Sequence, residues 1–357
     1  MIRKYPKLCV TALLRNPSEE FKARYPDVKI EVGDFDAFEV IEKAASASDI
    51  VLRKAKSNHT NDWSARWLNN IIDMGDIDHP GCAAAVLSGL SKRAAPSFLI
   101  HLTGTGCISD EREQTWDGKC NPHIWHDVDE INEIYNLPDS AMHHVIDKNI
   151  MDASNELLHT ACICPPDIYG QSTGTGNRAT FLVPEYVKVL LTKTEAFYLG
   201  SGENMRAVTH VNDVVDLFLI LLGKGIEGGG DAQWGKEVSS SLILYILKAI
   251  NKELIQMKGF YFAVSGEIKW ADAASAICNI GVEQGWLPEG SSAISWTEKQ
   301  VASIMPDHPG RALYIWGSNS RAVSARAKNL GWSPNGPSFW EALREDVMVT
   351  VATAQKR

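Results

Sequence analysis

Apolar runs of strand length alternate with polar or amphipathic stretches of helix length through the first half of the chain. We expect strands at residues 8–14, 28–32, 49–52, 97–102 and 159–164, and helices at residues 18–25, 38–47, 83–90 and 139–158. Several strands end in turn residues, such as Arg15-Asn16-Pro17 and Gly33-Asp34. This order predicts an α/β fold, with a Rossmann-like, doubly wound parallel sheet.

The pattern becomes looser from about Pro166, where Gly-rich turns separate helices near residues 181–193 and 211–224. We therefore assign residues 1–170 to the Rossmann-like domain. Residues 171–357 are assigned mainly to a smaller C-terminal substrate lobe, with some elements returning to the sheet. A lobe in this position would cover the carboxyl ends of the strands, where folds of this kind bind their ligands.

Two segments do not follow either period. Residues 53–74 interrupt the strand that begins Asp49-Ile50-Val51-Leu52. Residues 238–258 separate the short segments 234–237 (WGKE) and 259–262 (GFYF). One interpretation is two surface insertions, the second an amphipathic helix. The other is two retained introns, because codons for Leu52-Arg53-Lys54 and for Val238-Ser239 can contain a GTAAG splice donor. The sequence leaves both interpretations open.

Composition narrows the class of protein. The chain of 357 residues is 45% hydrophobic and carries a net charge of -9, without a basic tract. These values argue for a globular protein and against nucleic-acid binding. No apolar stretch reaches the roughly 18 residues that span a membrane, and the N-terminus has no apolar signal region. The seven cysteines match no metal-binding pattern. We expect a cytoplasmic protein with no metal site and with a small-molecule substrate.

Several motifs together resemble one superfamily. They include the turn Gly33-Asp34, the strand end at 101–106 (HLTGTG), the helix at 142–148 (MHHVIDK), the turn at 165–170 (PPDIYG) and the run at 200–215 (GSGENMRAVTHVNDVV). With these motifs the chain resembles the extended short-chain dehydrogenase/reductases. More narrowly, it is similar to fungal NAD-dependent epimerase/dehydratase-type proteins with an atypical active site. The resemblance implies an NAD(P)-dependent oxidoreductase or epimerase acting on a small carbonyl or hydroxy compound.

The resemblance assigns cofactor contacts to four positions. Asp34 would accept a hydrogen bond from the adenine, and the turn at Pro165 would lie near the nicotinamide. Arg15 follows the strand whose end, in this superfamily, contacts the adenosine ribose. A guanidinium there favours a 2′-phosphate, so we predict NADP, with NAD as the alternative. Lys148 would bind the nicotinamide ribose, as the lysine of the superfamily's Tyr-x-x-x-Lys motif does.

The same resemblance implies the catalytic and substrate residues. Thr103 best matches the active-site Ser/Thr, with Thr105 as a substrate-binding alternative at the same turn. The position of the catalytic tyrosine is taken by His144, whose imidazole can still exchange a proton. We therefore predict Thr103, His144 and Lys148 as catalytic residues. Arg206 matches an arginine that contacts the substrate's distal phosphate in nucleotide-sugar members.

One superfamily feature is missing ahead of Leu8: the first strand and its Gly-rich turn, which binds the cofactor pyrophosphate. The sequence thus predicts an N-terminally truncated sheet with an uncovered centre. Two further hypotheses stay open beside the enzyme: a non-catalytic dinucleotide-binding or regulatory protein, and an inactive product of a mis-spliced gene. Members of the superfamily commonly dimerise through long helices, so the resemblance also allows a homodimer.

Overall fold

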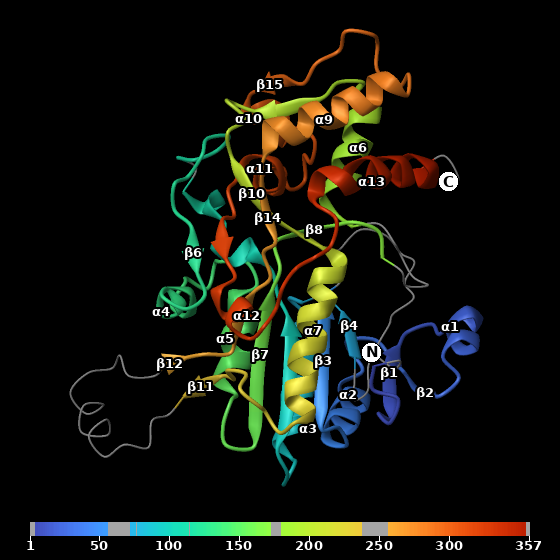
Figure 1. Cartoon of the computed structure of the whole chain (residues 1–357), viewed down its shortest axis with the longest axis vertical. Helices are drawn as coiled ribbons and strands as arrows, with labels where there is room; N and C mark the ends of the chain where they lie inside the picture. Colours follow the sequence, from blue (N-terminus) through green and yellow to red (C-terminus); the bar gives the residue numbers. More distant parts are fainter. Residues whose placement is uncertain are drawn as a thin grey trace, which may run out of the picture.

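The computed structural model describes residues 4–55, 72–75, 77–113, 115–172, 180–237 and 256–354. Its main sheet has seven strands in the order β13-β7-β5-β3-β4-β1-β2, and every pair of neighbours is parallel (Figure 1). The strands are β1 (Val10–Leu14), β2 (Val28–Val32), β3 (Ile50–Ala55), β4 (Ile72–Gly75), β5 (Ser97–Leu102), β7 (Leu158–Cys164) and β13 (Phe260–Phe262). The predicted α/β fold with a Rossmann-like parallel sheet is confirmed.

Helices cover both faces of this sheet. Helix α7 (Val211–Ile226) packs on one face, and α2 (Phe38–Ser46), α3 (Pro80–Ser91) and α5 (His144–Asp152) pack on the other. Alternate residues of one strand serve the two cores: Phe98 and Ile100 of β5 face α7, whereas Leu99 faces the opposite layer. Burial on both faces explains why these strands are continuous apolar runs. Helix α1 (Glu19–Arg24) packs against β1 and β2 through Phe21.

The centre of the sheet differs from the expected gap. Strand β4 lies between β1 and β3, and its Ile72 is the parallel partner of both Ala12 and Leu52. Strand β3 also continues beyond Leu52 to Ala55. Residues 56–71 lie outside the described residues. The segment 53–74, which resembles an insertion, therefore supplies a strand where the sequence predicted an uncovered centre. Without β4, the facing edges of β1 and β3 would have unpaired backbone N–H and C=O groups.

The second unusual segment begins and ends in a short ladder. Strand β11 (Lys236–Glu237) pairs antiparallel with β12 (Gln256–Met257). The amphipathic helix predicted between them falls on residues 238–255, which lie outside the described residues.

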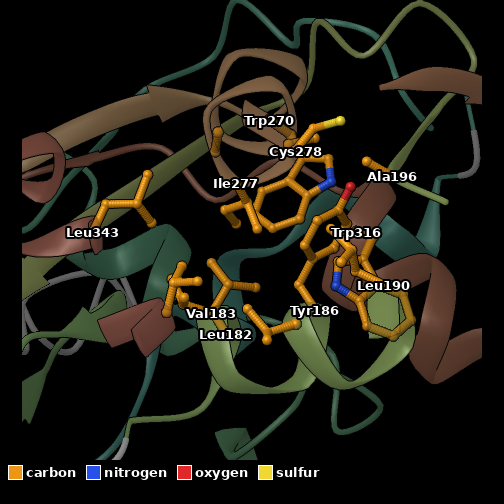
Figure 2. Close-up of a cluster of buried hydrophobic side chains, with 14 of the residues drawn as sticks. Leu182, Val183, Tyr186, Leu190, Ala196, Trp270, Ile277, Cys278, Trp316 and Leu343 are labelled. Carbon is orange, nitrogen blue, oxygen red and sulfur yellow. The ribbon is translucent and has the colours of Figure 1, made fainter. Parts of the chain in front are cut away.

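A second group of elements stands over the carboxyl ends of the main strands (Figure 1). Its helices are α6 (Leu182–Lys193), α9 (Trp270–Glu283), α10 (Glu298–Ala302), α11 (Pro309–Gly317) and α13 (Phe339–Ala354). Its strands are β8 (Asp167–Tyr169), β9 (Phe197–Leu199), β10 (Met205–His210), β14 (Gly266–Lys269) and β15 (Ile294–Trp296). Tyr186, Trp270 and Trp316 fill its centre (Figure 2). Burying each such ring contributes about 2–3 kcal/mol, which gives this lobe a core of its own.

Short elements connect the two parts. They are β6 (Trp125–His126), α4 (Ile131–Tyr135), β16 (Ala322–Val323), α12 (Ala325–Asn329) and two 3-10 turns at Thr105–Ile108 and Asp110–Arg112. The imidazole of His210 caps α7 by accepting the N–H of Asn212 at 3.3 Å. The carboxylate of Asp213 accepts the N–H groups of Asn335 and Gly336, both at 2.9 Å. The run 210–215 thus anchors the C-terminal segment to α7, while the domain boundary at residue 170 stays a prediction.

Candidate functional site

Polar side chains meet where β3, β5 and β7 end. Thr103 follows β5, and its backbone N–H donates to the carbonyl of Ile163 in β7. Its hydroxyl donates to Oδ2 of Asp147 in α5 at 2.6 Å, and both side chains are buried. Because a threonine hydroxyl has one proton, Thr103 can only accept a further hydrogen bond. The structure thus places predicted Thr103 at the strand ends, bound to a carboxylate that the sequence analysis did not single out.

A buried chain of polar groups continues from Asp147. Nε2 of His101 lies 3.2 Å from Asp147 Oδ1, and Nδ1 of His101 lies 3.3 Å from Nη1 of Arg53. A guanidinium only donates, so Nδ1 accepts and the ring proton sits on Nε2, toward Asp147. Arg53 also donates to the carbonyls of Ile77 at 3.3 Å and His79 at 3.1 Å. Arg53 therefore ties three segments together: β3, β5 and the turn before α3.

His143 is the residue that the sequence reasoning missed. It precedes α5 in the left-handed region, with φ 67, a conformation that residues other than Gly seldom adopt. Its Nδ1 lies 2.8 Å from a carboxylate oxygen of Asp78. Its Nε2 would lie 3.3 Å from a Cβ placed on Gly104 and 3.2 Å from one placed on Gly106. The two glycines thus let the imidazole approach the turn after β5 closely.

Asp78 holds this histidine from the turn before α3. Burial raises the pKa of the Asp78 carboxyl, but the hydrogen bond with His143 and the nearby groups Arg53 and His101 outweigh it, so the pKa is lowered. A carboxylate accepts only, so Nδ1 of His143 carries a proton. In the neutral ring, Nε2 is then a lone pair directed at the glycine turn. The sequence did show two adjacent histidines at this helix, His143 and His144. Helix periodicity alone could not tell which of the two faces the strand ends.

The predicted His144 and Lys148 lie elsewhere on α5. His144 is buried, and burial lowers its pKa. The ammonium of Lys148 lies 3.4 Å from the ring centroid of Tyr135 in α4, a cation–π contact. Thr103 is instead contacted by Asp147, one residue earlier. His143 and Asp147, one turn apart, thus occupy the strand ends with the spacing that was expected of His144 and Lys148.

A second set of predicted residues gathers at the ends of β1 and β2. The guanidinium of Arg15 is exposed and lies 5.9 Å from the ring centroid of Phe35. Oδ1 of Asp34 accepts the N–H of Asp36 at 3.1 Å, which shapes the turn after β2. His79 reaches the same turn, with Nε2 3.2 Å from Asp36. An aromatic ring, a guanidinium and a carboxylate side by side suit an adenosine with a phosphate on its ribose.

The predicted turn residues lie between the two sets of polar groups. Pro165 is buried, and its carbonyl accepts the N–H of Thr105 at 3.0 Å; Thr105 is buried as well. This bond joins the turns after β5 and β7 beside Gly104. The turn from β4 to α3 contains Gly75 but not the Gly-rich pattern that cradles pyrophosphate. The residues present fit the two ends of a dinucleotide better than its middle.

Arg206 is buried rather than open to a ligand. Nε donates to Asp167 at 2.7 Å, and Nη1 donates to Oγ of Ser318 at 2.8 Å and to the carbonyl of Tyr314 at 3.1 Å. Burial disfavours the charge, but Asp167 more than compensates, so the pKa of Arg206 is raised. The predicted substrate arginine thus already has an ionised partner within the chain.

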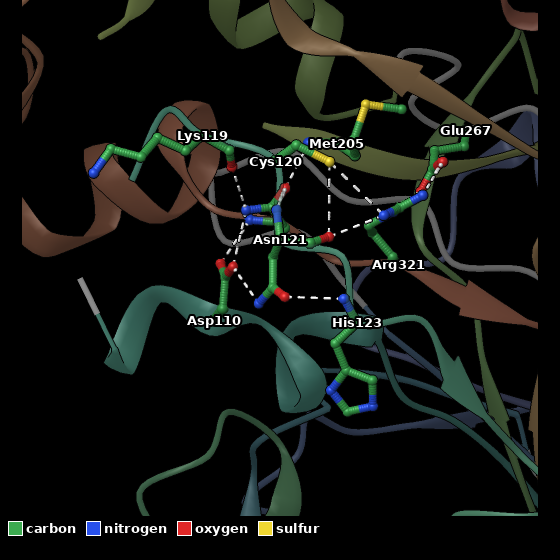
Figure 3. A network of polar contacts seen from close by, with 9 residues as sticks. Asp110, Lys119, Cys120, Asn121, His123, Met205, Glu267 and Arg321 are labelled. Atoms are coloured by element: carbon green, nitrogen blue, oxygen red, sulfur yellow. Dashed lines mark hydrogen bonds and ion pairs between the residues drawn. The ribbon is translucent and has the colours of Figure 1, made fainter. Parts of the chain in front are cut away.

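A polar network fixes the strand that carries Arg206 (Figure 3). The side chain of Asn319 accepts the N–H of Met205 at 2.7 Å and that of Asn121 at 3.3 Å. Its amide donates to Asp110 at 2.8 Å, and Asn121 donates to the same carboxylate at 3.0 Å. The loop after β5 is therefore tied to β10, and the next residue of this loop, Glu111, is close enough to Arg206 to interact with its charge.

Two other kinds of site are absent from the part of the chain that the structure describes. Among the described residues, no group of three or more His, Cys, Asp or Glu side chains is arranged to hold a metal ion. The helices in the same part of the chain are all too short or too polar to cross a membrane.

Known proteins resemble this chain in sequence and in fold. The Oxidase ucsJ of Acremonium sp is 26% identical over 353 residues, which cover 95% of this chain and 88% of that protein. UDP-glucose 4-epimerase of Thermotoga maritima, solved with UDP-glucose, has a TM-score of 0.55 at 12% identity, covering 98% of this chain and 93% of its own. The dTDP-glucose 4,6-dehydratase of Bacillus anthracis, solved with NAD, has a TM-score of 0.58 at 12% identity, covering 99% and 92%.

One family model matches the segment that carries α5, β7 and the turn at Pro165. Residues 138–233 match the model of the NAD dependent epimerase/dehydratase family. This match, together with the fold, confirms the resemblance of the chain to the extended short-chain dehydrogenase/reductases.

Proposed function

We propose that this chain is an NAD(P)-dependent oxidoreductase or epimerase that acts on a small hydroxy or carbonyl compound. The observation that carries the proposal is His143: its Nε2 faces the glycine turn at the strand ends, and its Nδ1 is bonded to Asp78 at 2.8 Å. The curated relative is named as an oxidase, and the solved neighbours include epimerases and dehydratases, some with NAD bound, which supports redox chemistry at this site.

Arg15, Asp34 and Phe35 would hold the adenosine end of the cofactor, and the turn at Pro165 and Gly104 would hold its nicotinamide end. The exposed guanidinium favours NADP over NAD. Lys148 would reach the nicotinamide ribose only after leaving Tyr135. When bound, the dinucleotide accepts or donates the hydride, which the protein side chains cannot do.

The chain's own task is then to move one proton. In the oxidising direction, Nε2 of His143 takes the proton of the substrate hydroxyl while the C–H bond breaks and a C=O bond forms. The carboxylate of Asp78 stabilises the imidazolium produced. In the reducing direction, the same nitrogen returns the proton to the carbonyl oxygen. Thr103, whose proton is committed to Asp147, could accept a hydrogen bond only from a second substrate hydroxyl, because the reacting hydroxyl gives its one proton to His143. His144 is buried and is the less accessible of the two histidines.

A second function is favoured by one observation. Lys148, expected at the nicotinamide ribose, lies against Tyr135. A chain that bound the dinucleotide through Arg15 and Asp34 without turning it over would be a dinucleotide-binding or regulatory protein. It would bind NADPH yet oxidise it with none of the compounds tested.

The test is a screen for turnover. The whole chain is mixed with NADP⁺ and a panel of small alcohols, or with NADPH and the matching carbonyl compounds, and nicotinamide absorbance is followed. We expect turnover with at least one pair and a loss of about 100-fold in kcat for His143→Gln. The exposed His123→Gln serves as the matched control and should retain full activity. Activity unchanged in His143→Gln would contradict the assigned role, whereas NADPH binding without any turnover would favour the second function.

A further inference from the structure

The surroundings of Arg206 bear on which substrates the proposed site beside His143 accepts. The hydroxyl of Tyr314 would lie 3.1 Å from a Cβ on Gly106, and Nε2 of His143 lies 3.2 Å from the same point. The ring of Tyr314 in turn has its centroid 5.2 Å from Cζ of Arg206. Arg206 therefore lies one aromatic ring away from the proposed proton-transfer residue, where a substrate's remote group would extend.

The hydrogen bonds of Arg206 leave no fork for a phosphate. A guanidinium grips phosphate with two parallel N–H groups, and each such pair contains Nη2 together with either Nε or Nη1. Nε has one proton, which goes to Asp167 at 2.7 Å. Nη1 has two protons, which go to Ser318 and to the carbonyl of Tyr314. Neither pair can therefore be offered to a ligand without breaking a buried bond.

Charge acts in the same direction. Arg206 is 2% exposed, and its charge is matched by Asp167 at 2.7 Å. Carboxylates gather on the loop after β5 as well, where burial raises the pKa of Glu111 despite the nearby Arg206. Burial and the acidic groups around it, Asp110 and Glu111 among them, raise the pKa of Asp117 to about 6. With its charge matched by Asp167 and with carboxyl groups nearby, Arg206 presents no excess positive charge to attract a diphosphate.

We propose that Asp167 determines substrate class in this chain: by engaging Arg206 it makes the substrate site reject phosphorylated compounds, and the substrate is a small, uncharged or cationic molecule rather than a nucleoside diphosphate derivative. The inference rests on the proposed function in taking the strand ends beside His143 as the substrate site. It predicts that removing the negative charge of Asp167 creates a phosphate site out of Arg206.

Calorimetric titration with UDP tests this inference. The whole chain is first saturated with NADP⁺, so that UDP cannot report the dinucleotide site. The wild type should show no UDP binding at millimolar concentration. Asp167→Asn should bind UDP at least about tenfold more tightly, because one charge-assisted contact becomes available. The double variant Asp167→Asn/Arg206→Gln should lose that gain, and a thermal melt of each variant checks that it is folded.

Each outcome decides the matter. Binding of UDP by the wild type would overturn the proposal, and so would a folded Asp167→Asn that gains no affinity. If Asp167→Asn does not fold, the wild-type titration alone decides, with no binding as the supporting result. A separate titration with NADPH reports the proposed function. If that titration fails, UDP is titrated without NADP⁺, and a wild type that binds no UDP still supports the role of Asp167.

Discussion

The hydroxyl of Thr103 donates to Asp147 across 2.6 Å, from the end of a central strand to the first full turn of a helix. This bond joins β5 to α5 at the level where the fold binds ligands. It also fixes the direction of hydrogen bonding, because Thr103 has no second proton to offer a substrate. Behind it, His101 and Arg53 extend the same buried chain to the turn that carries Asp78. The stability of the strand ends and the placement of His143 therefore depend on one connected set of groups.

Thr103→Val should destabilise the protein by about 1–3 kcal/mol, because the buried Asp147 carboxylate would lose its hydroxyl donor. Urea unfolding of both proteins measures the difference. Thr192→Val is the matched control: Thr192 is exposed and bonds only the preceding helical turn, so its free energy of unfolding should change by less than about 0.5 kcal/mol. Equal effects of the two changes would contradict the importance of the Thr103–Asp147 bond.

Arg53→Met should cost about 3 kcal/mol or more, since the buried His101 and two backbone carbonyls would lose their hydrogen-bond donor. The same measurement on Arg344→Gln, whose side chain is half exposed, should give a change of less than about 1 kcal/mol. This prediction also bears on the segment beginning at residue 53. A small effect of Arg53→Met would mean that this segment is not built into the sheet.

Because His144 is buried, we expect the free energy of unfolding to depend on pH in the range where this histidine titrates. Burial lowers its folded pKa below the ordinary 6.5. The unfolded chain therefore binds the proton more readily, and the free energy of unfolding should fall as pH drops below about 6.5. His144→Asn should flatten that slope. Half-buried His159 contributes in the same direction, because burial lowers its pKa as well, so part of the slope should remain. An unchanged slope in His144→Asn would show that the residue is not buried in its neutral form.

Because the pKa of Asp78 is lowered, we expect a second pH dependence of the free energy of unfolding, at lower pH. Its folded pKa is lowered below the ordinary 3.8, so its contribution to stability is present above that value and is lost as pH falls through the folded pKa. Asp78→Asn should therefore be less stable than the wild type near neutral pH. The difference should shrink below about pH 3.8, in denaturant unfolding curves recorded at several pH values. A difference independent of pH would mean that the charge on Asp78 does not matter.

Much of the fold was predictable because alternation of apolar runs fixes strand positions closely. The expected strands 28–32 and 97–102 coincide with β2 and β5. The helix expected at 139–158 was wrong in length: α5 begins at His144 and ends at Asp152, and Leu158 already belongs to β7. Turns around Pro138 occupy its first residues. The hydrophobic periodicity of a sequence does not distinguish one long helix from a turn followed by a shorter helix.

The site was harder to predict for a related reason. A change of one residue rotates a helical side chain by about 100°. The spacing His-x-x-x-Lys at 144 and 148 and the spacing His-x-x-x-Asp at 143 and 147 are equally regular in the sequence. The structure directs the second pair to the strand ends because His143 adopts a left-handed conformation before the helix starts. Nor could sequence place β4, since pairing partners in a sheet are set by contacts distant along the chain.

The hypothesis of retained introns remains a prediction for the transcript. A cDNA read through codons 53–74 and 238–258 tests it directly. In the structure, these two segments supply Arg53 and strands β4 and β12. A transcript without them would require another strand at the centre of the sheet.

The central claim is that the strand ends bind a nicotinamide dinucleotide, and tryptophan fluorescence of the whole chain titrated with NADPH and with NADH tests it most directly. We predict saturable quenching, tighter for NADPH than for NADH. Arg15→Ser should weaken NADPH binding by about 10-fold or more while leaving NADH little changed. The absence of saturable quenching by either dinucleotide would contradict the account.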